Sequence, residues 1–422
     1  MPLAWLALSC LVILAVPGCA RKVPQAPPEV QATPEPEIAI PAPPVEVVEP
    51  GPVVVEPLED APDSFMPDFR EPGMVRIGFL APLSGPRADL GGALLNAAQL
   101  ALFDHAEEGL TLVPKDTRGT ASGAAAAMQE LTSEGVDLVI GPLLGDSVRA
   151  VAPIARPTGV PVVAFSNDRT AAGDGIFIIG FTPGQQIERV VAHAVKNGHR
   201  RFAALVPRGA YGDAVVSALY EATGRNAASI GRIEYFNPGA PADVAPVQSL
   251  VAAAGLDEDG VPTGFDALLI AAGGESLRGL ALLFPYYDLD PSQVQFLGTG
   301  QWKDSALLGE PALLNGWFAA APDSGFAGFR TRYQSAFASA PPRLATLGYD
   351  AVVMASALAS RAGGADFGEL SLTDPVGFSG TDGKFRLRRD GVAERALTVY
   401  RVAPRSFQVR DPAPDDFGTA SF

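Results

Sequence analysis

The segment Val75-Arg76-Ile77-Gly78-Phe79-Leu80-Ala81-Pro82-Leu83-Ser84-Gly85 joins a short apolar run to a turn. The apolar run predicts a strand that is buried on both faces, and the Pro, Ser and Gly that follow it are typical of a turn. Further along, Leu94, Ala98 and Leu102 are spaced four apart and predict a helix. A buried strand, a turn and a helix in this order predict the first unit of a parallel α/β sheet.

The same unit repeats along the chain. Further apolar runs predict strands at 137–140, 160–165, 176–181, 202–206, 230–236, 267–271 and 295–297. Helices are predicted near 146–156, 185–197, 213–223, 242–254 and 276–284. These strands are too numerous for one comfortable sheet. The sequence therefore predicts an α/β fold of two Rossmann-like lobes with doubly wound parallel sheets.

The N-terminus looks like a processed leader. Residues 4–16 are apolar but too few for a relaxed membrane span, and they end at Val16-Pro17-Gly18-Cys19. This ending resembles a lipobox, whose cysteine becomes the lipid-modified first residue of the mature protein. We therefore expect a lipoprotein signal peptide over 1–18 and lipid attachment at Cys19. An ordinary cleaved signal peptide is the alternative.

A Pro-rich segment follows the leader. Residues 20–72 contain 14 prolines, 11 acidic and 3 basic side chains, a composition that cannot build a core. We expect a disordered linker over 19–72 that spans up to roughly 150 Å at ~3.1 Å per residue. The expected binding domain covers 73–405, and 406–422 is expected to be a flexible tail.

Composition excludes several classes of function. The formal net charge is −16, which argues against binding to nucleic acid. Both cysteines, Cys10 and Cys19, lie in the leader region, and the three histidines have no metal-ligand spacing. No nucleophile, phosphate-loop, zinc-protease or dinucleotide motif is found. We expect no enzyme, no metal and no cofactor.

Turn-like segments follow the predicted strands. Ligands of such sheets bind beyond the carboxyl ends of the strands. Any single turn is explained by helix capping, but several together predict a shared cleft. The residues expected to line it are Ser84, Arg87, Gly145, Asp146, Ser147, Ser166, Asn167, Asp168, Tyr211, Gln301 and Trp302.

The chain resembles the leucine-binding, type I periplasmic receptor family. The resemblance is carried by Ile77–Gly85 with Gly91, by Gly141-Pro142 and by Tyr211-Gly212, and near the C-terminus by Tyr349-Asp350 and Phe378–Gly383. It implies two α/β lobes joined by several crossings. Lobe 1 would take about 74–182 and 316–365, and lobe 2 about 183–303 and 375–405.

Within that superfamily the chain is most similar to the penicillin-binding protein activator family of LppC-type lipoproteins. The lipobox, the long linker and the segments Gly141–Leu143 and Pro161–Asp168 carry this similarity. It implies an outer-membrane lipoprotein that faces the periplasm and binds a peptidoglycan synthase.

The alternative is the substrate-binding protein of an ABC importer, with a permease as partner. Amino-acid receptors of this superfamily hold the ligand carboxylate with small hydroxyl residues and the ligand ammonium with an acid. In this chain the carboxylate-binding positions correspond to Gly145 and Ser166–Asp168, and the position of the acid corresponds to Gly300. Asp146 and Asp168 would then repel the carboxylate by a few kcal/mol at ~4 Å. A pairing of Asp168 with Arg169 or Arg87 would remove this objection.

Overall fold

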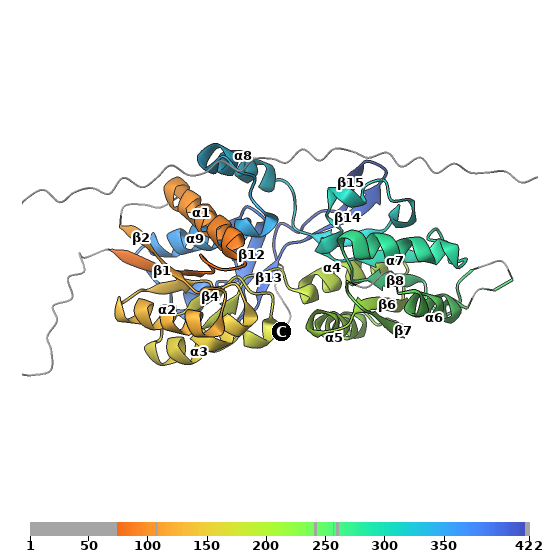
Figure 1. The fold of residues 1–422 in the computed structure, drawn as a ribbon, viewed down its shortest axis with the longest axis horizontal. Helices are drawn as coiled ribbons and strands as arrows, with labels where there is room; N and C mark the ends of the chain where they lie inside the picture. The colour runs from red at the N-terminus through yellow and green to blue at the C-terminus, as the bar shows by residue number, and fades with distance from the viewer. Residues whose placement is uncertain (1–73, 106–108, 240–242, 256, 259–260, 418–422) are drawn as a thin grey trace, which may run out of the picture. The chain divides into compact units, whose positions relative to one another are not determined.

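The computed structural model describes residues 74–105, 109–239, 243–255, 257–258 and 261–417. This part of the chain forms two lobes, each a sheet with helices on both faces (Figure 1). The prediction of a two-lobed α/β fold is thereby confirmed. The predicted signal peptide 1–18, the lipid-attachment residue Cys19 and the linker 19–72 lie outside the described residues.

Lobe 1 is built on a five-stranded sheet in which all neighbouring strands are parallel. The strands lie in the order β2 (Leu110–Asp116), β1 (Val75–Ala81), β3 (Leu138–Ile140), β4 (Val162–Ala164) and β5 (Ile176–Ile178). One face packs on α2 (Ala121–Ser133) and α3 (Gly145–Thr158). The other packs on α1 (Ala88–His105), α8 (Phe326–Phe337) and α9 (Thr346–Ala359). Burial on both faces explains why these strands read as continuous apolar runs.

Lobe 2 contains a seven-stranded sheet. Its order is β15 (Ser406–Asp411), β14 (Thr398–Ala403), β10 (Trp317–Ala320), β9 (Gln295–Gly298), β8 (Ala267–Ile270), β6 (Arg201–Pro207) and β7 (Ser229–Phe236). One face packs on α4 (Pro183–Lys196) and α5 (Ala210–Arg225), and the other on α6 (Val244–Ala254) and α7 (Gly274–Tyr286). The last two strands are antiparallel, whereas the expectation was of parallel sheets.

A small antiparallel sheet belongs to lobe 1. It consists of β11 (Phe378–Gly380), β12 (Gly383–Leu387) and β13 (Ala393–Arg395) and follows the short helix α10 (Glu369–Leu372). Phe385 and Leu387 of β12 are buried in the lobe 1 core. The chain therefore passes between the lobes three times, at 179–182, 321–325 and 396–397. We call these segments the first, second and third crossovers.

Glycine is required where two helices start against the preceding strand. A Cβ at Gly91 in α1 would lie 2.0 Å from the carbonyl oxygen of Pro82, and one at Gly212 in α5 would lie 1.7 Å from that of Pro207. No side chain fits at such distances, so these helices approach the strand ends closely only because both positions are glycine. This close approach holds the helix N-termini at the edge of each sheet.

The lobe boundaries differ from those expected. β10 lies in the lobe 2 sheet, although 316–365 was expected in lobe 1, and the β11–β13 sheet packs on lobe 1 although 375–405 was expected in lobe 2. Residues 406–411 form β15 rather than a tail. This edge strand escapes sequence analysis because most of its side chains are exposed and it lacks an apolar run.

No helix or strand was predicted beyond residue 297, and within the region before it β2 and α2 of lobe 1 were also missed. β2 contains Pro114 and Lys115, which weaken the apolar signal but are tolerated because β2 is an edge strand. α2 is largely alanine, and Thr120 caps it by accepting the N–H of Gly123 at 3.0 Å. An edge position and an N-cap thus account for these two elements, but neither element has the strong apolar periodicity from which strands and helices were predicted.

Candidate ligand-binding cleft

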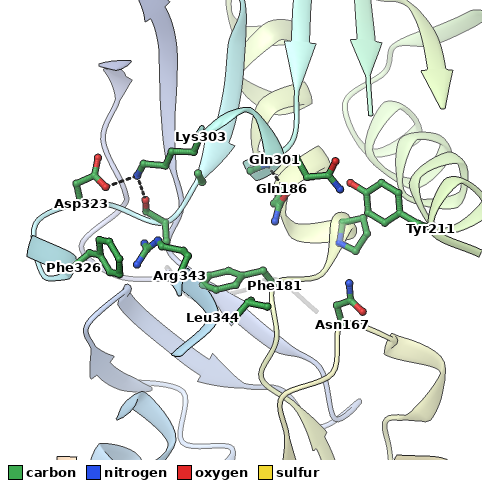
Figure 2. A pocket seen from close by; sticks show the side chains of 14 residues that line it. Asn167, Phe181, Gln186, Tyr211, Gln301, Lys303, Asp323, Phe326, Arg343 and Leu344 are labelled. Carbon is green, nitrogen blue, oxygen red and sulfur yellow. Dashed lines mark hydrogen bonds and ion pairs between the residues drawn. The ribbon is translucent and has the colours of Figure 1, made fainter. Parts of the chain in front are cut away.

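A cavity of about 660 Å³ lies between the two lobes, beside the first and second crossovers. Its size is within the range of small-molecule sites in proteins. The lining side chains fall into three groups along its length, which Figure 2 shows from close by. One end is polar and uncharged, the middle is apolar and the other end carries charges.

The uncharged end is formed by three carboxamides and a phenol. Asn167 follows β4 and Gln301 follows β9, so both stand beyond the carboxyl ends of their strands. Tyr211 lies in the first turn of α5, and burial raises the pKa of its hydroxyl. Gln186 of α4 accepts the backbone N–H of Gly300 at 2.7 Å through its amide oxygen. This end provides hydrogen-bond donors and acceptors without formal charge.

The middle of the cavity is apolar. Phe181 enters from the first crossover and Leu344 from the turn before α9, whereas Phe326, at the start of α8, lies beside Arg343 at the charged end (Figure 2). The Leu344 side chain is 38% exposed and is therefore available to a ligand. Ala320 and Ala321 complete this wall from lobe 2. The cavity can therefore bury an apolar surface of a ligand between the lobes.

The charged end contains an internally bonded lysine. The Lys303 ammonium donates to the carbonyl oxygen of Ala321 at 2.6 Å and to the Tyr400 hydroxyl at 2.9 Å, and it pairs with Asp323 at 2.8 Å. Burial lowers the pKa of Lys303, and the Asp323 carboxylate acts against this. All three donors of the ammonium group therefore have partners in the protein.

Arg343 lies at the same end. Its guanidinium forms an ion pair with the fully buried Asp382 and stacks 4.2 Å from the ring centre of Phe326. The terminal nitrogens Nη1 and Nη2 of Arg343 have almost no accessible surface. Arg343 therefore lines the cavity with side-chain atoms other than Nη1 and Nη2.

Behind the cavity, a buried charge network holds the crossovers together. Arg395 at the third crossover donates through Nε and Nη2 to the carbonyl oxygen of Ile179 at 3.2 and 2.8 Å. Its Nη1 lies 3.7 Å from Oδ2 of Asp350 in α9. Burial, with repulsion from Asp382, raises the pKa of Asp350 to about 7. The network joins the first and third crossovers to lobe 1 beside Phe181, whose ring faces Arg395 at 4.6 Å.

Of the residues expected from the sequence, Asn167, Tyr211 and Gln301 line the cavity together. Ser84 and Arg87 do not, although both side chains are exposed. The Ser84 hydroxyl instead donates to the Asp116 carboxylate at 2.6 Å. Gly145, Asp146 and Asp168 also lie outside the cavity lining, so their prediction as cleft residues is wrong.

The acids Asp146 and Asp168 share one partner, Arg149. Arg149 donates to Asp146 at 2.6 Å and pairs with Asp168, so the arginine partner of Asp168 is Arg149 rather than Arg169 or Arg87. Arg169 instead pairs with Glu221 of lobe 2 at 3.2 Å.

Gly145 leaves room for this arrangement, because a Cβ there would lie 2.8 Å from the Asp168 carboxylate. Burial acts to raise the pKa of Asp168, but hydrogen bonds from Thr170 and Arg149 outweigh it and lower the pKa. Asp168 therefore stays ionised in the loop that carries Asn167, just outside the cavity lining.

Three expected cleft residues are structural. The buried Ser147 hydroxyl donates to the carbonyl oxygen of Thr120 at 3.3 Å, and the buried Ser166 hydroxyl accepts the N–H of Asp168 at 3.1 Å. Trp302 has no exposed surface, packs in the lobe 2 core and donates from its indole N–H to the carbonyl oxygen of Ile270 at 3.1 Å. The short helical turn after Thr299 directs Gln301 to the cavity and Trp302 to the core.

Sequence analysis missed most of the apolar and charged lining. Phe181 and Asp323 lie on crossovers, and Phe326, Arg343 and Leu344 lie between β10 and α9. These residues escaped prediction because ligands of α/β sheets usually bind beyond the carboxyl ends of the parallel strands, and none of these residues lies in such a loop of a predicted strand. A signal was available in Tyr349-Asp350 and Thr381-Asp382, whose acids anchor this side of the cleft.

The described residues have no constellation that suggests a bound metal. Over 74–417, apart from the short gaps, no three His, Cys, Asp or Glu side chains come together in a way that would hold an ion. In the same range no helix combines the length and the apolar character needed to cross a membrane.

Curated relatives share parts of the chain, among them the following two proteins. An uncharacterized protein of Rickettsia prowazekii is 20% identical over 225 residues, which is 53% of this chain and 60% of that protein. The penicillin-binding protein activator LpoA of Vibrio cholerae is 26% identical over 147 residues, which is 34% of this chain and 24% of LpoA. The chain thus spans less than two thirds of each of these relatives.

Solved structures share the fold over most of the chain. An ABC transporter substrate-binding protein from Sphaerobacter thermophilus has a TM-score of 0.65 at 20% identity, covering 81% of this chain and 98% of that one. A Rhodopseudomonas palustris solute-binding protein in complex with 3,4-dihydroxybenzoic acid has a TM-score of 0.58 at 20% identity, covering 81% and 99%. The Streptococcus pneumoniae protein LivJ in complex with isoleucine has a TM-score of 0.56 at 19% identity, covering 80% and 100%.

The extent of the family match agrees with the two-lobed body. A family model described as "Periplasmic binding protein" matches residues 74–406, from the first residue of the described range to the start of β15. This range includes both sheets' parallel strands, all three crossovers and every residue of the cleft. The chain belongs to the periplasmic binding protein family.

Proposed function

We propose that the chain is a lipid-anchored regulator that binds a peptidoglycan synthase, and that it acts by binding rather than by catalysis. The observation that carries this proposal is the Asp146–Arg149–Asp168 group, which lies outside the cavity lining but next to Asn167, a residue of the lining. One guanidinium serves two carboxylates, so the group has a net charge of −1. A negative group beside the cleft disfavours the α-carboxylate of an amino acid at this end.

The lobe 2 side of the cleft is also unsuited to an amino-acid ligand. Gly300, at the position where a receptor would hold the ligand ammonium, has no side chain, and its N–H is used by Gln186. A zwitterionic amino acid would therefore find no acid near its ammonium, and the charge beside the Asn167 end of the cleft would have the same sign as its carboxylate. This is the reason for preferring a regulator to an amino-acid receptor. The similarity to the Vibrio cholerae activator supports the choice of a peptidoglycan synthase as partner.

The test is a reconstitution with purified full-length protein. The chain would be mixed in detergent with the peptidoglycan synthases of the same organism, and complex formation and the rate of glycan polymerisation would be measured. We expect a stable complex with one synthase and a faster rate. If no synthase binds and no rate changes, the regulator proposal is wrong.

The anchor is a separate part of the proposal. We expect Cys19 to carry lipid and the body to face the periplasm from the outer membrane. Multiple acyl chains hold a protein firmly, whereas one chain alone is marginal. The variant Cys19→Ala should therefore appear in the soluble fraction of lysed cells. Recovery of Cys19→Ala in the membrane fraction would contradict the anchor.

The second candidate is a solute receptor that delivers a ligand to an ABC permease. The observation that favours it is the cavity of about 660 Å³, which is open between two lobes of the receptor fold. An importer receptor would bind its solute tightly without any synthase present. A permease encoded beside the chain, with solute-stimulated ATP hydrolysis in the reconstituted complex, would favour the importer over the regulator.

A further inference from the structure

The accessible charge in the cleft differs from its total charge. Among the lining residues, Lys303 and Arg343 are the cations and Asp323 is the acid. The Lys303 side chain is 13% exposed, whereas that of Asp323 is 62% exposed. A ligand entering the cavity therefore meets the carboxylate of Asp323 before it meets the ammonium of Lys303.

Neither cation presents a free donor at the cavity surface. The three donors of Lys303 are bound by Ala321, Tyr400 and Asp323. The terminal nitrogens of Arg343 make no hydrogen bond, but they have almost no accessible surface and their charge is paired with Asp382. A ligand carboxylate would have to break one of these pairs and leave a buried acid without its partner, which costs several kcal/mol.

Apart from the Asp323 carboxylate, the polar groups that the cleft offers to a ligand are uncharged. The side chains of Asn167 and Gln301 are exposed to the cavity, and Gln186 retains its amide N–H groups because only its oxygen is bound to Gly300. Each carboxamide can donate and accept at once, which matches amides and hydroxyls. Asp323 at the far end can accept from further hydroxyl groups.

The apolar wall sets the shape of the ligand. Phe181 and Leu344 lie between the polar ends, so the ligand needs an apolar surface between its polar groups (Figure 2). A pyranose ring has such a surface in its C–H groups, and it has hydroxyls at its edges. An N-acetyl substituent adds an amide that pairs with a carboxamide side chain.

We propose that the cleft binds an uncharged ligand rich in amide and hydroxyl groups, of the class of N-acetylated amino sugars, and rejects free carboxylates. The rejection of carboxylates is argued from the cleft alone, and the choice of amino sugars also rests on the proposed role in peptidoglycan synthesis. Proteins of the same fold bind carboxylate compounds, isoleucine in one case and 3,4-dihydroxybenzoic acid in another. The proposal therefore separates this chain from those neighbours by ligand charge.

The experiment is calorimetry on the purified full chain in detergent with named probes. N,N′-diacetylchitobiose tests the sugar class, and benzamide against benzoate tests charge at nearly constant shape. We expect chitobiose to bind, and benzamide to bind at least about tenfold more tightly than benzoate.

Variants locate the site. Gln301→Ala and Asn167→Ala should each weaken chitobiose binding by about 3- to 10-fold, the value of a lost neutral hydrogen bond. Gln129→Ala, an exposed carboxamide on α2 outside the cleft, is the matched control and should change nothing. Gln301→Lys adds an accessible cation and should increase benzoate binding relative to the wild type.

The two parts of the proposal can be refuted separately. Tighter binding of benzoate than of benzamide by the wild-type chain would overturn the exclusion of carboxylates. Absence of chitobiose binding, or binding that Gln301→Ala and Asn167→Ala do not weaken, would overturn the amino-sugar assignment. Neither measurement involves a synthase, so failure of the synthase reconstitution leaves the ligand result standing, and the reverse also holds.

Discussion

Asp350 should make the stability of the lobe 1 body depend on pH. Its side chain has no exposed surface, Oδ1 accepts the N–H of Thr381 at 2.6 Å, and Arg395 is no closer than 3.7 Å to Oδ2. Burial is the main reason that the pKa rises from 3.8 to about 7, and repulsion from Asp382 adds to it. The folded protein therefore binds the Asp350 proton more tightly than the unfolded chain does.

The sign of the effect follows from this difference. The stabilisation is fully present below the unfolded pKa of 3.8, and it is lost progressively as the pH rises to the folded pKa of about 7. Between pH 5 and pH 8 the wild-type protein should lose roughly 2–3 kcal/mol of unfolding free energy through this group, at about 1.4 kcal/mol per pH unit. The variant Asp350→Asn has no proton to lose and should lack this contribution.

Urea unfolding at pH 5, 6, 7 and 8 measures the effect. The stability of Asp350→Asn relative to the wild type should rise by roughly 2–3 kcal/mol across this range. Asp290→Asn is the control, because a backbone hydrogen bond from Ser292 lowers the pKa of Asp290 and moves its titration below the range tested. A constant difference between Asp350→Asn and wild type at all four pH values would refute the reasoning.

Two further predictions concern packing near the cleft. At Gly380 a Cβ would lie 2.4 Å from the Asp350 carboxyl carbon, so Gly380→Ala should cost about 1–3 kcal/mol in thermal unfolding. The control is Gly92→Ala in α1, where no atom lies within 4 Å of the new Cβ. This substitution should be neutral or stabilising by up to ~1 kcal/mol. Equal effects of the two substitutions on thermal unfolding would contradict the predicted crowding at Gly380. Trp302→Phe removes the buried bond to the carbonyl oxygen of Ile270 and should cost roughly 1–3 kcal/mol. It should leave chitobiose affinity unchanged in calorimetry, and a loss like that of Gln301→Ala would place Trp302 in the cleft after all.

The fold was predictable to the extent that its signals are local. β1, β3, β4, β6 and β8 are apolar runs, and the helices between them have apolar faces or capping residues that can be found in the sequence. β15 and β2 were missed because edge strands need only backbone partners, and their side chains do not identify them. The assignment of β10 to a lobe is set by pairing with β9, which lies across a long sequence gap.

The site was predictable only in part. Asn167, Tyr211 and Gln301 were found because the carboxyl ends of parallel strands meet at one edge of each sheet. In the turn after β9, Gln301 lines the cavity whereas the next residue, Trp302, packs in the lobe 2 core. Trp302 was wrongly predicted to line the cleft because no sequence pattern distinguished it from Gln301. The role of Arg149 was missed because only Asp146 is its neighbour on α3, whereas Asp168 lies 19 residues away in the loop after β4.

Composition and apolar periodicity are enough to predict the layered α/β architecture, the acidic charge, the lack of cysteine in the body and some of the loops that face the cleft. These properties depend on composition and on contacts between near neighbours along the chain. Which charges a ligand can reach depends instead on tertiary packing. Lys303 and Arg395 have partners on crossovers, and Arg343 and Asp350 have partners in or beside the β11–β13 sheet. All of these partners lie on other elements, so whether a charge is accessible or already paired depends on how those segments pack.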